Sequence, residues 1–379
     1  LARIPTIRVP ARTSSNYFEG KDVDIPTIAE RLNVAHVLEG SVQKSGNRIR
    51  VTTQLVNAHS DTHLWSEIYE RELEDLFSIQ NEIAVSVVEH LKIELLSEPP
   101  RARAQNPEAL ELFLQAIHFS MLGTRAGNDK AVELLQEAIA IDPDYSMAWS
   151  QLGLVYGNQA FDGEVDATQG QTKALDALQK AIEIDPTNGV AWSRLGSNWL
   201  AIKGDLAQSA EYFQRALSLE PGNTLVLFNA HLLAQGMGRT ELMVKFAELG
   251  LEGDPLNPMF YYALGNAYFL NGQLDESEDI LREALLLSPD MSSVNAVLSR
   301  VQFEREDQSQ LEEALRNANN EPVELSRLLA TSIIHYALGN EEKSTQAMNA
   351  LIELCVPQDF PLIAIAYASI GDTEKAFEW

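Results

Sequence analysis

Residues 255–289 read PLNPMFYYALGNAYFLNGQLDESEDILREALLLSP, and they give the strongest indication of the fold. Tyr261 and Tyr268 lie seven residues apart, which is two turns of an α-helix, so their side chains share one face. Gly265 between them allows a partner helix to approach closely. Pro289 closes a second helix, because proline cannot continue the hydrogen-bond ladder. The stretch therefore predicts two helices packed against each other.

This pattern recurs with a period near 34 residues. First helices repeat the large and small positions, with Trp149 and Gly153 in one unit and Trp192 and Gly196 in the next. The prolines that end second helices are spaced 43, 35, 34, 34, 33 and 35 residues apart, namely Pro143, Pro186, Pro221, Pro255, Pro289, Pro322 and Pro357. The predicted units are 107–143, 144–186, 187–221, 222–255, 256–289, 290–322, 323–357 and a truncated 358–379.

These units resemble the tetratricopeptide (TPR) repeat, whose first helix carries a W-x2-L-G-x2-Y pattern. The resemblance covers residues 107–379 and implies an α-solenoid of about seven repeats and part of an eighth. The sixth unit departs from the pattern, with Asn295 and Gln302 at its large positions. The second carries about nine extra residues near 161–166, which we expect in a solvated loop or an extended first helix.

The first hundred residues follow a different period. Residues 48–56 alternate in polarity, and together with residues 36–43 and a turn at 45–47 they predict a β-hairpin. We also expect a strand over 4–9, a helix over 24–32 that Asp24 caps, and a long amphipathic helix over 73–96. The predicted fold class is mainly α, with an α+β domain ahead of the solenoid.

Six N-terminal motifs resemble the TolB-amino-terminal-like (FlgO-like) domain over residues 1–98: ARTSS (11–15), GKDVD (20–24), VLEGSV (37–42), RIRVTTQL (48–55), HLW (63–65) and YEREL (69–73). The resemblance implies a domain without its first strand and helix, as part of a longer protein. A shift in charge near Pro99 and Pro100 indicates a domain boundary, and we expect a linker over 99–106. It also implies that His63 packs beside Trp65. In relatives these modules follow an adenylate cyclase domain, or a winged-helix domain and a membrane helix, so the resemblance implies a bacterial signalling protein.

The charge of the chain excludes some partners. The 379 residues include 28 Lys and Arg against 55 Asp and Glu, a formal net charge of −27. Residues 1–100 hold 10 basic and 15 acidic residues, so most of the acidic excess lies in the repeats. Nucleic acid and anionic membrane surfaces require clustered cations, so neither is expected as a partner. No stretch is long and apolar enough to predict a membrane span.

Motifs for catalysis are not evident in the sequence. There is neither a Gly-rich phosphate loop nor a nucleophile elbow, and one cysteine, Cys355, cannot form an internal disulfide. His59, Asp61 and His63 bring two imidazoles near a carboxylate, but the turn residues around them do not converge as a metal site requires. We expect no metal, no cofactor and no enzymatic activity in these residues.

Side chains one turn away from the packing positions are expected to line the concave face of the solenoid. Aromatic groups there would offer contact area, and Asn side chains would hold a peptide backbone. Ser150, Ser193 and Tyr262 stand where relatives that grip a terminal carboxylate have Lys, so we do not expect that mode. The candidate groove residues are Arg194, Phe228, Asn229, Tyr262, Asn266, Phe269, Arg300 and Phe303. The alternative is that they form ordinary packed or solvated surface.

The leading hypothesis for function is a non-enzymatic protein-interaction module of a bacterial signalling protein. Because the chain is acidic, we expect its partner segment to be apolar or basic. A second hypothesis is the regulatory region of a class III adenylate cyclase. A third is self-association through the hairpin edge or the open solenoid end. The compartment, cytoplasmic or extracytoplasmic, depends on segments upstream of these residues.

Overall fold

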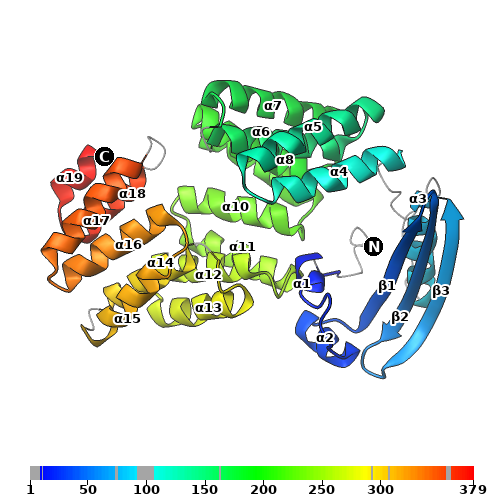
Figure 1. Cartoon of the computed structure of the whole chain (residues 1–379), viewed down its shortest axis with the longest axis horizontal. Coiled ribbons are helices and arrows are strands. Elements are labelled where there is room, and N and C mark those ends of the chain that lie inside the picture. The colour runs from blue at the N-terminus through cyan, green and yellow to red at the C-terminus, as the bar shows by residue number, and fades with distance from the viewer. Residues whose placement is uncertain are drawn as a thin grey trace. The chain divides into compact units, whose positions relative to one another are not determined.

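The computed structural model describes residues 9–10, 12–72, 76–91, 106–161, 164–291, 293–305, 308–355 and 360–379. Its chain is mostly helical, with one small sheet near the N-terminus (Figure 1). By contacts it divides into two compact units. Unit 1 comprises Leu1–Leu233 and Glu252–Leu256, and unit 2 comprises Ala234–Leu251 and Asn257–Trp379.

An antiparallel sheet in unit 1 contains the predicted hairpin. Strands β1 (His36–Ser45) and β2 (Arg48–Asn57) pair with Ser45 opposite Arg48. Gly46 forms the turn at φ 61°, a left-handed conformation that favours glycine. The hairpin prediction is therefore confirmed, whereas strand β3 (Thr62–Glu72), which pairs with β2, was not predicted.

Helix α3 (Leu76–His90) packs on one face of this sheet. Ile79 and Val87, which are 1% and 2% exposed, lie on the predicted apolar stripe, and Ile79 packs with Ile49 and Val51 of β2. The predicted helix over 73–96 thus forms over its central part, and residues 73–75 and 92–96 lie outside the described residues.

Helix α2 (Ile25–Leu32) forms where the sequence predicts a helix over 24–32. The Asp24 carboxylate accepts a hydrogen bond from the Thr27 N–H at 2.8 Å, as an N-cap does. A short helix, α1 (Arg12–Asn16), precedes it and was not predicted. The strand expected over 4–9 falls almost wholly outside the described residues.

His63 does not pack as the resemblance implies. Its side chain is exposed on β3, and the indole of Trp65 instead lies 5.9 Å from the imidazole of His90 on α3. The strand register shifts between Leu55 and Val56 of β2, opposite this point. A local irregularity of this kind changes which side chains share a face, and sequence alternation does not indicate it.

From residue 107 onward, each predicted repeat unit contains one pair of helices. In the three pairs before residue 222 and the four pairs after residue 255, the two helices contact each other, in the solenoid-like arrangement of TPR repeats. The pairs are α4 (Pro107–Ser120) with α5 (Arg125–Ile141), α6 (Ser146–Phe161) with α7 (Ala167–Ile184), α8 (Gly189–Lys203) with α9 (Leu206–Leu219), α10 (Thr224–Gly236) with α11 (Thr240–Gly253), α12 (Pro258–Leu270) with α13 (Leu274–Leu287), α14 (Val294–Glu304) with α15 (Gln308–Asn319), α16 (Glu324–Ala337) with α17 (Glu341–Leu354), and α18 (Phe360–Ser369) with α19 (Thr373–Glu378).

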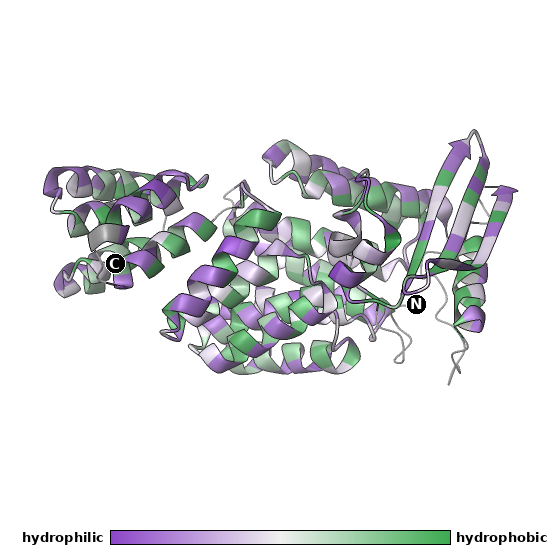
Figure 2. Cartoon of the chain, turned by 90° about the horizontal axis from the view of Figure 1, so that it is seen from below, coloured by the Kyte–Doolittle hydropathy of each residue, from purple (hydrophilic) through white to green (hydrophobic). Residues whose placement is uncertain are grey.

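Glycines of the repeat pattern bring the paired helices into direct contact. A Cβ added at Gly153 would lie 2.6 Å from Leu178 Cγ, and one added at Gly265 would lie 2.6 Å from Leu281 Cγ. Both distances are too short for real atoms, so each pair packs at a spacing that only glycine permits. The helices of the chain carry both hydrophobic and hydrophilic residues, as expected for helices with one buried face (Figure 2).

Hydrogen bonds add a second repeating contact. The indole N–H of Trp149 donates to the Pro143 carbonyl at 2.9 Å, and that of Trp192 donates to the Pro186 carbonyl at 3.0 Å. The large first-helix residue thus holds the proline that closes the preceding repeat. The extra residues of the second repeat largely lengthen its helices, because α7 has 18 residues where α9 has 14.

One contact within unit 1 joins distant parts of the sequence. Ser14 on α1 donates its backbone N–H to Asp254 Oδ1 at 3.0 Å, and its hydroxyl donates to the same oxygen. The Ser14 hydroxyl also accepts from the Leu256 N–H at 2.8 Å. In the second repeat, Asp185 receives the corresponding hydroxyl and N–H from its own neighbour Thr187. Ser14 therefore donates to Asp254 of the fourth repeat the two hydrogen bonds that Thr187 donates to Asp185 in the second.

Candidate interaction surface on the first helices

Arg194 of α8 is a half-buried residue of the predicted groove in unit 1. Its guanidinium donates to the Ser150 hydroxyl and to Gln151 Oε1, each at 3.0 Å, and both residues belong to the neighbouring first helix α6. Ser150 and Gln151 are 2% and 7% exposed. Burial lowers the pKa of the Arg194 side chain to about 10, so the group stays cationic at neutral pH.

Asn229 and Phe228 of α10 continue this surface within unit 1. The Asn229 amide donates to the Ser193 hydroxyl at 3.3 Å, which connects α10 to α8. The Phe228 ring stacks on the buried imidazole of His231 at 6.3 Å and 10°. Both predicted residues stay half-buried, so part of each side chain faces solvent. The sequence placed these residues one turn from the packing set, and the structure brings Asn229 and Arg194 onto neighbouring first helices.

In unit 2, two predicted groove residues are buried. Asn266 and Phe269 of α12 are 7% and 8% exposed, and Phe269 belongs to a core cluster with Leu281 of α13. Arg300 of α14 covers the Phe269 ring, with its guanidinium carbon 4.7 Å from the ring centroid. Burial lowers the pKa of the Arg300 side chain. The Arg300 guanidinium therefore lies where we predicted that the Phe269 ring would contact a partner.

The remaining two predicted residues are half-buried. Tyr262 of α12 packs beside the same core cluster, and burial raises the pKa of its phenol. Phe303 near the end of α14 packs against the cluster that contains Leu329 and Ile333 of α16. Both aromatic rings thus link successive repeats of unit 2.

Neutral polar side chains form a network around Arg194 that the sequence reading missed in part. Gln151 donates its amide to the Ser120 hydroxyl at 3.2 Å, and Asn198 donates to the Arg194 carbonyl at 3.2 Å. The sequence signal was their spacing, since Ser150 and Gln151 stand one repeat before Ser193 and Arg194. The network fixes the guanidinium through amides and hydroxyls.

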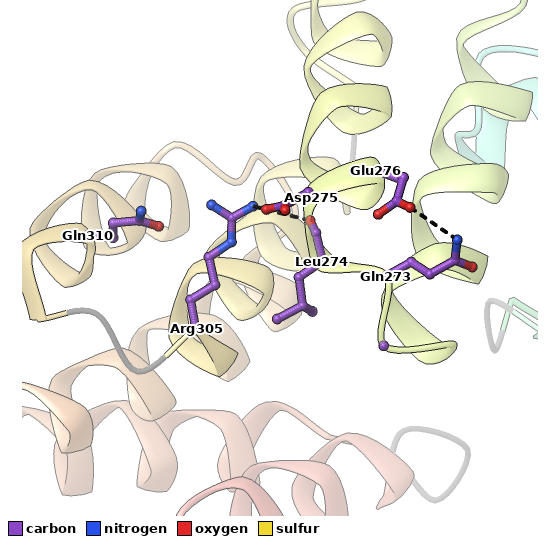
Figure 3. Close-up of a pocket in the computed structure, with 7 residues that line it drawn as sticks. Gln273, Leu274, Asp275, Glu276, Arg305 and Gln310 are labelled. Carbon is purple, nitrogen blue, oxygen red and sulfur yellow. Dashed lines mark hydrogen bonds and ion pairs between the residues drawn. The ribbon is translucent and has the colours of Figure 1, made fainter.

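A cavity of about 650 Å³ lies at the start of α13 and is open to solvent. Arg305 points into it and pairs with Asp275 at 2.6 Å (Figure 3). Arg305 also pairs with Glu278 at 2.8 Å. Gln273, Leu274, Glu276 and Gln310 also line this cavity (Figure 3). Because the one arginine in the lining already binds two carboxylates, the arrangement fastens α14 to α13 and presents little free charge.

Two further features of the described residues bear on function. None of the helices there combines the length and the apolar character that crossing a bilayer requires. Nor does any group of three His, Cys, Asp or Glu side chains within that part of the chain come close enough to hold a metal ion. Cys355 is half-buried and caps the end of α17.

Comparison with known proteins agrees with the helix pairs. The family model of the tetratricopeptide repeat matches residues 258–291. A Rhizobium meliloti (strain 1021) protein named "Putative adenylate cyclase 3" is 31% identical over 159 residues, which are 41% of this chain and 27% of that protein. The alignment thus spans about a quarter of the relative's length.

Solved structures with similar folds include the human IFIT1 dimer with m7Gppp-AAAA, with a TM-score of 0.51 and 14% identity over 79% of this chain and 75% of that one. A tetratricopeptide repeat protein from Parabacteroides merdae ATCC 43184 has a TM-score of 0.48 and 14% identity, covering 69% of this chain and 99% of that one. At these identities the likeness concerns the fold alone. Residues 258–291 are a tetratricopeptide repeat, set among helix pairs of the same kind.

Proposed function

We propose that residues 107–379 form a non-enzymatic module that binds a segment of a partner protein along the first helices of its repeats. The observation that supports this proposal is the surface of Arg194, Phe228 and Asn229. Hydrogen bonds to neighbouring first helices hold two of these side chains in place, and all three stay partly open to solvent. Fixed side chains of mixed polarity are what an extended peptide segment requires.

Site-specific photo-crosslinking in cells tests this proposal. p-Benzoylphenylalanine replaces Phe228, which preserves an aromatic ring, and in a matched control it replaces Glu183, an exposed residue of the second helix α7. We expect a protein adduct from position 228 and none from position 183. Equal adducts at both positions, or none at position 228, would contradict binding along the first helices.

A second candidate is the regulatory region of an adenylate cyclase, and the relative named as a cyclase supports it. The aligned 159 residues account for 27% of that protein, so cyclase activity itself belongs to this proposal and not to the residues described. Sequencing the coding region upstream of Leu1 is the first test. If a cyclase domain is found there, cyclic AMP production with and without residues 107–379 measures regulation, and equal rates would argue against it.

Self-association is a third candidate, through the free edge of β1 or the end of the last repeat. Strand β1 pairs with one neighbour, β2, so its other edge is open among the described residues. Light scattering over a hundredfold concentration range tests this idea. A constant monomer mass would contradict it.

A further inference from the structure

The helix pair of the sixth repeat, α14 and α15, has buried amides where the fifth repeat has aromatic rings. Asn295 and Gln302 of α14 occupy the two large positions of the repeat pattern, and they are 6% and 1% exposed. The fifth repeat has Tyr261 and Tyr268 at these positions. Burying an amide is unfavourable unless its N–H and C=O groups find partners. The stability of this pair therefore depends on how well its amides are hydrogen-bonded.

The hydrogen bonds of these amides are incomplete. Gln302 Oε1 accepts from the amide of Asn317 on α15 at 3.0 Å. Within the part of the chain that the structure describes, Gln302 Nε2 has no hydrogen-bond partner, and neither has the buried Oε1 of Gln310 on α15. A buried polar group without a partner destabilises the packed arrangement, because it loses the hydrogen bonds that it makes with water. Separation of α14 and α15 would return both groups to water.

Apolar contacts compensate little on α15. The described side chains of α15 that are buried and apolar are one leucine and two alanines, Leu311, Ala314 and Ala318. The second helix of the seventh repeat, α17, instead places Met348 and Leu351 in a core cluster. Because stabilisation by burial grows with apolar area, α15 is held more weakly than α17.

Helix α14 packs on the neighbouring repeats independently of α15. Val297 and Val301 belong to the same core cluster as Phe269 and Leu281 of the fifth repeat. Near the C-terminus of α14, Phe303 packs against the cluster that contains Ile333 of the seventh repeat. Loss of α15 would therefore leave α14 bound to both neighbouring repeats.

Polar contacts hold one end of the α15 segment firmly and the helix itself loosely. Glu321, which follows α15 and is 1% exposed, accepts the Ser293 N–H at the start of α14 at 2.8 Å. On α15, Glu313 pairs with Arg282 of α13 at 3.6 Å, and both side chains are about half exposed. An ion pair so open to solvent contributes little. The chain after α15 thus stays fixed while the helix is free to move.

We propose that α15 detaches from α14 in the folded protein, so that the sixth repeat opens locally while the fifth and seventh repeats stay packed. Local opening occurs where few apolar contacts oppose it. Water then supplies the hydrogen bonds that Gln302 Nε2 and Gln310 Oε1 lack. Because neighbouring contacts hold a solenoid together, the angle between the fifth and seventh repeats can change at this point. This inference concerns the free protein and goes beyond the proposed binding function.

Thiol labelling of a buried position on α15 tests the proposal. Ala314→Cys in a Cys355→Ser background places the only thiol on α15, and Ala284→Cys in the same background is the matched control on α13. Both alanines are 0% exposed in the packed structure. We expect iodoacetamide to modify position 314 at least tenfold faster than position 284 in the native protein. Equal rates would overturn the proposal.

Hydrogen exchange measured by mass spectrometry follows the same opening without a thiol. Backbone amides of α15 should exchange at least tenfold faster than those of α13 and α17. The double variant Gln302→Met with Asn317→Leu replaces both hydrogen-bonded amides by apolar groups, and it should slow the exchange of α15 about tenfold. Gln346→Met, at an exposed position of α17, is the control and should leave that rate unchanged.

Two exchange results would also overturn the proposal. One is exchange of α15 at the rate of α13 and α17, and the other is an unchanged rate in the folded double variant. If thermal unfolding shows that the double variant does not fold, the wild-type exchange and the thiol labelling decide. The crosslinking at position 228 tests the proposed function separately, since neither measurement here requires a partner.

Discussion

Among single residues, His335 of α16 links the stability of unit 2 to pH. Burial, and secondarily the charge of Lys343, lowers the pKa of its imidazole below the ordinary value of 6.5. The unfolded chain therefore binds the proton more readily, and the free energy of unfolding should fall as pH drops from about 7 to about 5. His335→Gln should flatten this dependence, as measured by urea unfolding at several pH values.

The exposed His63 supplies the control for this measurement. His63→Gln should leave the slope of stability against pH as it is in the wild type, since its side chain lies in solvent on β3. An unchanged slope in His335→Gln would show that other groups carry the pH dependence.

The residues of the candidate surface could be predicted from the sequence only in part. Helical spacing assigns a residue to a face, and it assigned Arg194 and Asn229 to first helices that the structure links through Ser150, Gln151 and Ser193. Spacing does not predict that a side chain of the next repeat covers the position. Phe269 is on the predicted face yet lies beneath the guanidinium of Arg300, so tertiary packing buried it.

For the elements, the helix pair of the fifth repeat depends on the absence of a side chain at Gly265. An alanine there would bring its Cβ to within 2.6 Å of Leu281 Cγ, and the side chain of Leu281 is fully buried. We expect Gly265→Ala to lower the free energy of unfolding by about 1–3 kcal/mol through overpacking, despite alanine's better helix propensity. Chemical denaturation of the purified protein measures the change.

Gly236, at the end of α10, provides a matched substitution. Nothing lies within 4 Å of a Cβ built at this position, and its φ is not in the left-handed region. Gly236→Ala should therefore be neutral or slightly stabilising. Equal destabilisation by both variants would argue that close packing is not the cause.

The helices and strands differ in how clearly the sequence predicts them. Repeat helices are recognisable because glycine, tryptophan and proline recur at fixed spacing, and each has a direct structural role, as in the hydrogen bond from Trp192 to Pro186. Strand β3 has no such signal. It places Trp65 and Tyr69 on the face towards α3, but Glu67 lies between them, so the alternation is incomplete. Strand β3 forms through its pairing with β2, and its own sequence does not predict that pairing.

At the scale of the whole molecule, the contact between Ser14 and Asp254 attaches the N-terminal segment to the solenoid within unit 1. Ser14→Ala removes a hydroxyl that joins the Asp254 carboxylate to the Leu256 N–H, and both Ser14 and Asp254 are 0% exposed. Leaving buried polar groups without this partner should cost about 1–3 kcal/mol. We expect faster proteolytic cleavage within residues 12–24 in Ser14→Ala than in the wild type.

The exposed Thr13, next along the same short helix, is the control. Thr13→Ala should be cleaved at the wild-type rate. If Ser14→Ala is cleaved no faster than Thr13→Ala, the contact does not hold the segment in solution.

This contact also has a consequence for biosynthesis. Ser14 and Asp254 are separated by 240 positions in the chain. A ribosome that adds about 5–20 residues per second delivers the carboxylate about 12–48 s after the serine. The sheet and the first three repeats can form in that interval, before Ser14 of α1 can bind Asp254. Residues 12–16 can therefore reach their final place only after the end of the fourth repeat has been synthesised.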